Sequence, residues 1–147
     1  MRKIIIFIPI ILGTIVGLLL MNSYEFYQSL IKPPLAPPSW LFPIVWSILY
    51  LLMGISYYMV VNDKDDLLAK QIYRLQLFFN LLWPVIFFAF RLLLLSSIWI
   101  ICLDVLVFYM ILLFYKINNK FGLWQVPYLL WTLFATYLNI SFFILNL

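Results

Sequence analysis

The stretch from Lys32 to Tyr50, KPPLAPPSWLFPIVWSILY, decides how this chain folds. Its first seven residues hold four prolines, and a fifth proline lies between its two tryptophans. Proline fixes φ, lacks an amide donor and biases the residue before it toward extended geometry. The beginning of the stretch therefore predicts a stiff connector rather than a membrane-spanning helix. The apolar residues from Trp40 onward predict the start of a helix, with Ser39 as its N-cap.

The composition predicts a membrane protein with several spans. Of the 147 residues, 67% are hydrophobic and 10% are charged, whereas soluble domains are about 45–50% apolar and about 25% charged. The length allows one domain, so we treat residues 1–147 as a single transmembrane domain. The net charge of +4 is spread over segment ends, with no basic cluster that could follow a phosphate backbone. We therefore expect the lipid membrane as a partner, and no nucleic acid.

Five apolar stretches reach the roughly 20 residues that a spanning helix needs. A strand would leave its amides unpaired in lipid, so each stretch is expected to be a helix. We predict an all-α membrane protein, a bundle of five transmembrane helices, with spans at about residues 4–21, 40–61, 73–90, 93–115 and 124–147. The proline-rich residues 22–39 then form a lid loop. The third and fourth spans divide between Arg91 and Ser97, where a charge and two serines permit a tight hairpin.

The distribution of basic residues predicts the orientation. With five spans, one side of the membrane carries seven of the nine Lys and Arg residues, and the other carries only Lys32 and Arg91. We therefore expect a multi-pass protein of a bacterial-type plasma membrane, with a cytoplasmic N-terminus. The proline-rich loop and the C-terminus would lie outside.

Three of the expected helices carry polar and aromatic side chains at helical spacing. One stripe lies in the second span, one in the third and one in the fifth: Trp46, Tyr50, Met53 and Tyr57; Tyr73, Gln76, Asn80, Trp83 and Phe87; Trp124, Tyr128, Trp131, Ala135 and Leu138, with Asn139 beside them. These stripes are either packing seams with interhelical hydrogen bonds or the walls of a site. Large rings around a few polar groups favour a site for a flat apolar ligand.

Two further intramembrane features leave alternatives open. Asp104 lies in the middle of the fourth span, where a charge is costly. It is either neutral, bonded across helices or, less simply, part of a proton relay. Gly13 and Gly17 form a GxxxG match in the first span, which is compatible with close packing inside the chain or with a homodimer.

Four blocks of the sequence together resemble the TspO/MBR family, also described as tryptophan-rich sensory proteins and translocator proteins. The blocks are KPPLAPPSW, PIVWSILYLLMGI, LQLFFNLLWPVIFF and PYLLWTLFATYLN. The resemblance implies a five-helix bundle whose pocket opens toward the first loop and binds porphyrins. By motif position, it implies that the ligand-binding residues are Trp40, Trp46, Tyr50, Asn80, Trp83, Trp131, Phe134, Ala135 and Leu138.

The leading functional hypothesis is a protein that binds a flat hydrophobic ligand, a porphyrin or other tetrapyrrole, in sensing or transport. The chain has no histidine, the commonest haem and metal ligand. We therefore expect no metal site and no required cofactor, with the porphyrin as ligand. The sequence shows no acid–base constellation, so no catalytic residue is predicted. Two alternatives remain: an enzyme that degrades protoporphyrin in light, and a small-molecule transporter.

Overall fold

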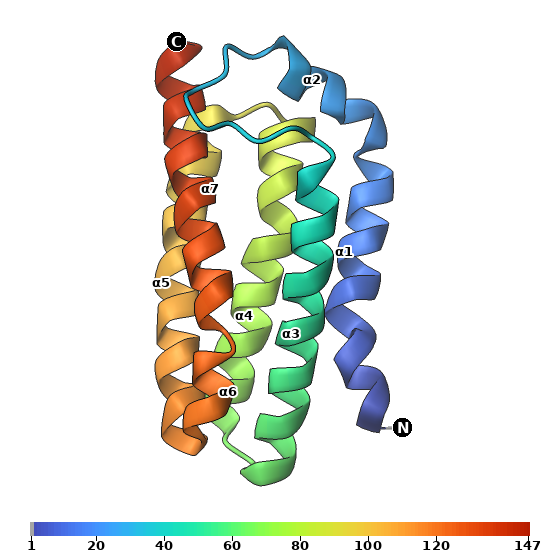
Figure 1. Ribbon diagram of the computed structural model, residues 1–147, viewed down its shortest axis with the longest axis vertical. Coiled ribbons are helices and arrows are strands. Elements are labelled where there is room, and N and C mark those ends of the chain that lie inside the picture. The colour runs from blue at the N-terminus through green and yellow to red at the C-terminus, as the bar shows by residue number, and fades with distance from the viewer. Residues whose placement is uncertain (1) are drawn as a thin grey trace.

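The computed structural model describes residues 2–147, and every regular element among them is a helix (Figure 1). Four segments are long and apolar enough to cross a bilayer: Leu41–Asp63, Leu67–Ala89, Leu93–Ile117 and Asn119–Leu145. The N-terminal part of the chain adds a fifth span if two of its helical pieces, Lys3–Leu19 and Met21–Ser29, count as one. These pieces meet at a 56° bend. The all-helical membrane architecture is therefore confirmed, with four spans or five.

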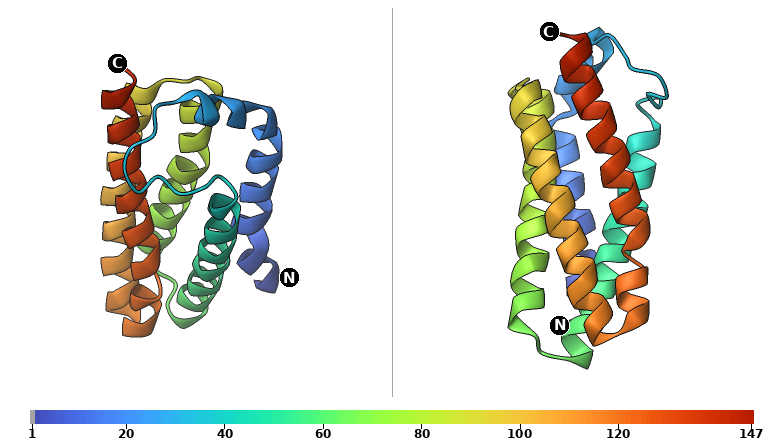
Figure 2. Two further views of the ribbon diagram at one scale, coloured as in Figure 1. Left: turned by 45° about the horizontal axis from the view of Figure 1, so that its top comes forward. Right: turned by 90° about the vertical axis from the view of Figure 1, so that its left-hand side faces the viewer.

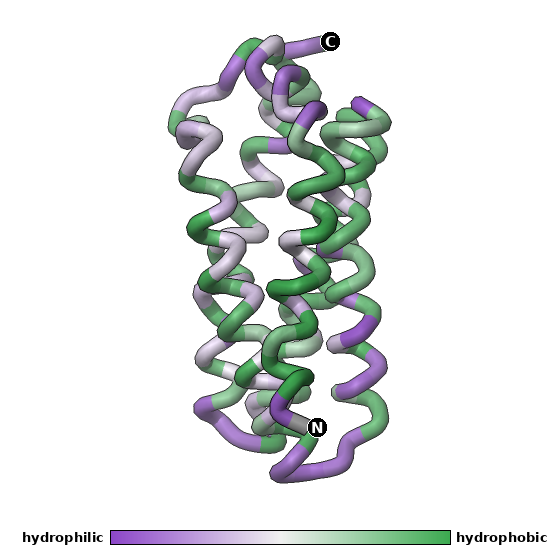
Figure 3. The backbone as a smooth tube through the Cα atoms, turned by 90° about the vertical axis from the view of Figure 1, so that its right-hand side faces the viewer, coloured by the Kyte–Doolittle hydropathy of each residue, from purple (hydrophilic) through white to green (hydrophobic). Residues whose placement is uncertain are grey.

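The long helices have the length that a bilayer requires. Helix α3 (Leu41–Asp63) has 23 residues and α5 (Leu93–Ile117) has 25. At 1.5 Å per residue, a helix of this length extends for roughly 35 Å, slightly more than the roughly 30 Å of a hydrocarbon core. Figure 3 shows that the strongly hydrophilic positions lie mainly at the two ends of the bundle.

The third span begins earlier than its hydropathy predicts. Helix α4 (Leu67–Pro84) begins six residues before the expected Tyr73. Its first turn is stabilised by Asp66, whose carboxylate accepts a hydrogen bond from the Ala69 amide at 2.9 Å. Ala69 is buried, whereas Arg74 is exposed, so the first turns are amphipathic. Hydropathy averaged along the sequence does not identify such turns as part of a span.

The turn between the third and fourth spans lies where the expected span bounds place it. A π-helical turn, Val85–Ala89, follows Pro84, and α5 begins at Leu93. Arg91 takes the corner with φ of 58°, a left-handed conformation that is uncommon outside glycine. The prediction that two serines belong to this hairpin was wrong. Ser96 and Ser97 lie inside α5, are buried and bond to the Leu93 carbonyl.

The remaining helices complete the bundle around α5. Helix α6 (Asn119–Leu123) turns the chain back into α7 (Val126–Leu145). Helix α5 packs against α4 on one side and α7 on the other, while α3 packs against the N-terminal segment (Figure 2). That segment begins with a 3-10 helix, Arg2–Phe7, and continues as α1 (Ile8–Leu19). The N- and C-termini lie at opposite ends of the bundle (Figure 1).

The chain between α1 and α3 covers one end of the bundle, which we call the loop end. A 3-10 turn (Met21–Ser23) and the short helix α2 (Tyr24–Ser29) lie across this end. The loop then runs toward the end of α7 and returns to the start of α3 (Figures 1 and 2). The predicted N-cap was wrong: Trp40 occupies that position and no side chain caps it, while Ser39 contacts Gln28.

Hydrogen bonds fix this loop to α7 at two places, and a third bond joins α2 to the proline-rich part of the same loop. Asn146 accepts from the Ile31 amide at 2.9 Å and donates to the Ile31 carbonyl at 3.1 Å. The Tyr137 hydroxyl donates to the Pro34 carbonyl at 2.9 Å, and the Tyr27 hydroxyl donates to the Pro37 carbonyl at 3.0 Å. The proline-rich loop is therefore fastened over this end of the bundle.

Replacement of Asn146 by Ala should loosen the cover. The change removes two hydrogen bonds to Ile31, each worth about 1 kcal/mol. Hydrogen exchange in residues 30–37 should accelerate at least about fivefold, as measured by mass spectrometry in detergent. Leu147→Ala, at an exposed neighbouring position, is the matched control. Equal exchange in the two variants would contradict the proposed fastening.

Candidate functional site

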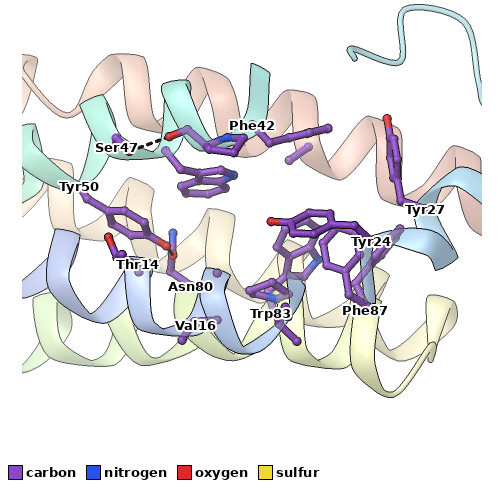
Figure 4. Close-up of a pocket in the computed structure, with 18 of the residues that line it drawn as sticks. Thr14, Val16, Tyr24, Tyr27, Phe42, Ser47, Tyr50, Asn80, Trp83 and Phe87 are labelled. Atoms are coloured by element: carbon purple, nitrogen blue, oxygen red, sulfur yellow. Dashed lines mark hydrogen bonds between the residues drawn. The ribbon is translucent and has the colours of Figure 1, made fainter. Parts of the chain in front are cut away.

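A cavity of about 400 Å³ lies beneath the loop end (Figure 4). This volume falls in the range of small-molecule sites, about 300–1,000 Å³. Side chains from α1, α2, α3, α4 and α7 line it, together with the π-helical turn, whereas α5 contributes none of the lining residues. The walls are mainly apolar and aromatic, including Trp46, Tyr50, Trp83, Phe87 and Leu138.

Six of the nine predicted ligand-binding residues line the cavity: Trp46, Tyr50, Asn80, Trp83, Ala135 and Leu138. The other three lie elsewhere. Trp40 is 65% exposed at the start of α3. Trp131 packs behind the wall, with its ring 6.1 Å from that of Phe42, and Phe134 packs on Trp131 at 5.5 Å.

The register of α7 explains the position of Trp131. The inward face of this helix follows Tyr128, Thr132, Ala135, Leu138 and Phe142, all of them buried. A stripe drawn at spacings of three and four passes through either Trp131 or its neighbour Thr132. Thr132 is fully buried, so the small residue is the one that faces the neighbouring helices.

A directional series of hydrogen bonds forms the floor of the cavity. The Tyr50 hydroxyl donates to Asn80 Oδ1 at 2.7 Å, and Asn80 Nδ2 donates to the Tyr128 hydroxyl at 2.7 Å. Tyr128 donates in turn to Gln76 Oε1 at 2.8 Å, and the Gln76 amide contacts the Met53 sulfur. All these side chains are buried. Because each donor has an acceptor, burial of the network is compatible with stability.

A second polar cluster fixes one aromatic wall. The Trp83 indole nitrogen donates to Asn139 Oδ1 at 2.8 Å. Asn139 Nδ2 donates to the Ser97 hydroxyl at 2.7 Å and to the Ser96 hydroxyl at 3.0 Å. The cluster joins α4, α5 and α7, and it holds the Trp83 ring against the cavity.

The π-helical turn brings additional rings to the cavity. Pro84 has no amide to donate, and the wider turn that follows it places both Phe87 and Phe88 on the cavity wall. Turns of this kind occur often at functional sites. Tyr24 of α2 packs on Phe88 with ring centroids 5.3 Å apart, and Tyr27 packs on Phe142 at 5.4 Å. Aromatic rings therefore form much of the cavity wall at the loop end.

Helix α1 supplies a wall that the aromatic stripes do not indicate. Ile10, Gly13, Thr14 and Gly17 all line the cavity. A Cβ atom at Gly13 would collide with the Tyr50 ring, whereas Gly17 faces open space. In the sequence, the GxxxG match was the feature that could have indicated this wall. Gly13 allows close packing against Tyr50 within the chain.

The charged residues lie outside the cavity. No Lys, Arg, Asp or Glu occurs among its lining residues, all of which belong to the part of the chain that the structure describes. Over residues 2–147, no group of three His, Cys, Asp or Glu side chains is placed to hold a metal. Asp104 faces α7 instead, where its Oδ2 pairs with the Thr136 hydroxyl at 2.6 Å.

These features define an integral membrane protein whose helices enclose an aromatic cavity beneath a fastened loop. The chain belongs to the TspO/MBR family, whose model matches residues 5–145.

Relatives share much of the length. The chain is 37% identical over 122 residues to the "Tryptophan-rich protein TspO" of Archaeoglobus fulgidus, a match that covers 82% of this chain and 79% of that protein. It is 32% identical to the "Tryptophan-rich sensory protein" of Cereibacter sphaeroides, with 86% and 80% covered. The human "Translocator protein" is 29% identical, with 80% and 73% covered.

The floor network should contribute measurably to stability. Tyr128→Phe leaves the Asn80 amide without an acceptor and Gln76 Oε1 without a donor. We expect a loss of about 2 kcal/mol, or roughly 4–8 °C in the apparent Tm in detergent.

The double variant Tyr128→Phe/Gln76→Leu removes one of the two unpaired groups and should regain part of that loss. Tyr109→Phe, at an exposed tyrosine, is the control and should leave the Tm unchanged. A Tyr128→Phe protein as stable as the control would show that the network is not a constraint.

Proposed function

We propose that this protein binds a flat hydrophobic ligand of the tetrapyrrole class in its cavity, in the service of sensing or transport. The observation that carries the proposal is the cavity of about 400 Å³ with the rings of Trp46 and Trp83 on its wall. Aromatic contacts of offset or edge geometry add about 0.5–1.5 kcal/mol each beyond area burial. A planar macrocycle is the ligand shape that uses several such rings at once.

The family supports this proposal. The resemblance to TspO/MBR proteins implies porphyrin binding, and relatives carry the names "Tryptophan-rich sensory protein" and "Translocator protein". Because the chain has no histidine, ordinary histidine ligation of haem iron is not available. Metal-free protoporphyrin should therefore bind at least as tightly as its iron complex.

The charges around the cavity favour one orientation for an acidic ligand. Asn80 already donates to Tyr128 and accepts from Tyr50, and the lining has no cationic side chain. Carboxylates would therefore point toward the loop end. Lys32 lies there with its ammonium 5.0 Å from the centroid of the Tyr27 ring, and Arg91 lies over Phe26 at 5.3 Å.

The proposed setting is a bacterial-type plasma membrane with the N-terminus in the cytoplasm. The excess of basic residues on the N-terminal side supports this orientation, and the two termini lie at opposite ends of the bundle (Figure 1). The loop end would then face outward. A topology reporter fused after Leu147 should accordingly show that the C-terminus lies outside the cytoplasm.

Replacement of Trp83 by Leu should weaken protoporphyrin binding at least about tenfold, because it removes a wall ring of the cavity. The absorbance change of the porphyrin on titration into detergent-solubilised protein measures the affinity. Trp124→Leu removes a 40% exposed tryptophan that does not line the cavity, and it should have no effect. Equal affinities in both variants, with both proteins folded, would count against this site.

A further inference from the structure

The N-terminal segment packs closely on α3 at its start, and the space beside it opens toward the loop end. At Gly54 of α3, any Cβ atom would collide with the Ile6 backbone, so the two segments touch. At Gly13, a Cβ atom would still collide with the Tyr50 ring. One turn further, Gly17 has nothing within 4 Å of the position that its Cβ would occupy. The gap therefore opens at the height of the cavity.

The exposed part of the cavity wall lies at this gap. Five lining residues are exposed. They are Thr14, Leu18 and Met21 of the first segment, and Pro43 and Ser47 of α3. The lining residues from α7, by contrast, are all buried, and so are Asn80 and Trp83 of α4. The exposed lining residues therefore all lie on the side of the cavity between the first segment and α3, whereas Pro84 and Phe88 beside α4 are half-buried.

The loop end offers no comparable passage. Tyr27, which is 3% exposed, closes this end with its ring packed on Phe42 and Phe142. Its hydroxyl is bonded to Pro37, and the loop is fastened again at Pro34 and Ile31. A ligand that entered here would have to displace packed rings and break these hydrogen bonds.

The rim of the gap is compatible with lipid. The Thr14 hydroxyl donates to the Ile10 carbonyl at 2.7 Å, and the Ser47 hydroxyl donates to the Pro43 carbonyl at 2.7 Å. Each rim hydroxyl is thus satisfied within its own helix. No polar hydrogen of the rim requires water, as the hydrocarbon layer demands. Small side chains at these positions keep the gap wide.

We infer that the cavity opens sideways, between α1 and α3, into the hydrocarbon layer of the membrane. We call the gap bordered by Thr14, Gly17, Pro43 and Ser47 the side opening. Its ligand is a lipophile dissolved in the bilayer, which enters between the helices while the loop stays closed. This inference rests on the proposed function for the identity of the ligand, but the opening itself can be tested without it.

Enlarging the rim tests the path with protoporphyrin supplied from phosphatidylcholine bilayers. Ser47→Trp should slow association with reconstituted protein at least about tenfold. An obstacle on the path slows exit as well as entry, so the dissociation rate should fall too. Ile15→Trp is the matched control, because Ile15 is exposed on α1 and does not line the cavity. Asn146→Ala, which loosens the loop, should leave the rate unchanged.

The opposite pattern would overturn the inference. If Asn146→Ala accelerates loading while Ser47→Trp behaves like Ile15→Trp, the ligand enters through the loop end.

A second measurement needs no porphyrin. Phosphatidylcholine with a photoreactive group on its acyl chain should label Trp83, a buried residue that faces the cavity. It should not label Phe114, which is buried in the bundle core away from the cavity. Labels confined to outward residues such as Ile15 and Ile44 would show that the cavity is closed to lipid. If Trp83 is labelled and protoporphyrin does not bind, the proposed function fails and the side opening stands.

Discussion

A polar side chain in the hydrocarbon layer has no water to bond, and this constraint governs how the bundle is assembled. Tyr50, Asn80, Tyr128 and Gln76 come from α3, α4 and α7, and each completes the hydrogen bonding of the next. Any shift of one helix along another would leave a donor or acceptor unpaired. The network therefore sets the relative positions of three helices at the depth of the cavity floor.

The cavity follows from what lies above that floor. Three helices are held together at the network, but toward the loop end they carry large rings such as Trp46, Trp83 and Phe87. Rings of this size keep the backbones apart, and the polar cluster around Asn139 holds Trp83 in place. Helix α1 lines the fourth side and packs closely on Tyr50 at Gly13, whereas the space beside Gly17 is open. The hydrogen bonds of the floor and the large aromatic side chains above it together leave a cavity of ligand size.

The sequence predicted the helical membrane fold and part of the cavity wall for physical reasons. Spans follow from apolar length, and the stripe through Asn80 and Trp83 follows from helical spacing, since both residues are buried. The stiff proline loop was also predictable, because proline restricts the backbone wherever it occurs.

Other positions depend on how the helices pack. Helical spacing fits Trp131 and Thr132 alike, and it is Thr132 that is fully buried. Ser96 and Ser97 suggest a turn by composition, but they are buried partners of Asn139. The contribution of α1 to the cavity wall could not be predicted, because it depends on the open space beside Gly17. Only the packed structure shows that space.

The central claim is that the rings on α3 and α4 surround vacant volume that a flat apolar ligand fills. A crystal structure of the protein with protoporphyrin tests this claim most directly. The account predicts density for the macrocycle between α1, α3, α4 and α7, in contact with Trp46 and Trp83. Density confined to the outer surface of the bundle, or a cavity filled by collapsed side chains, would contradict it.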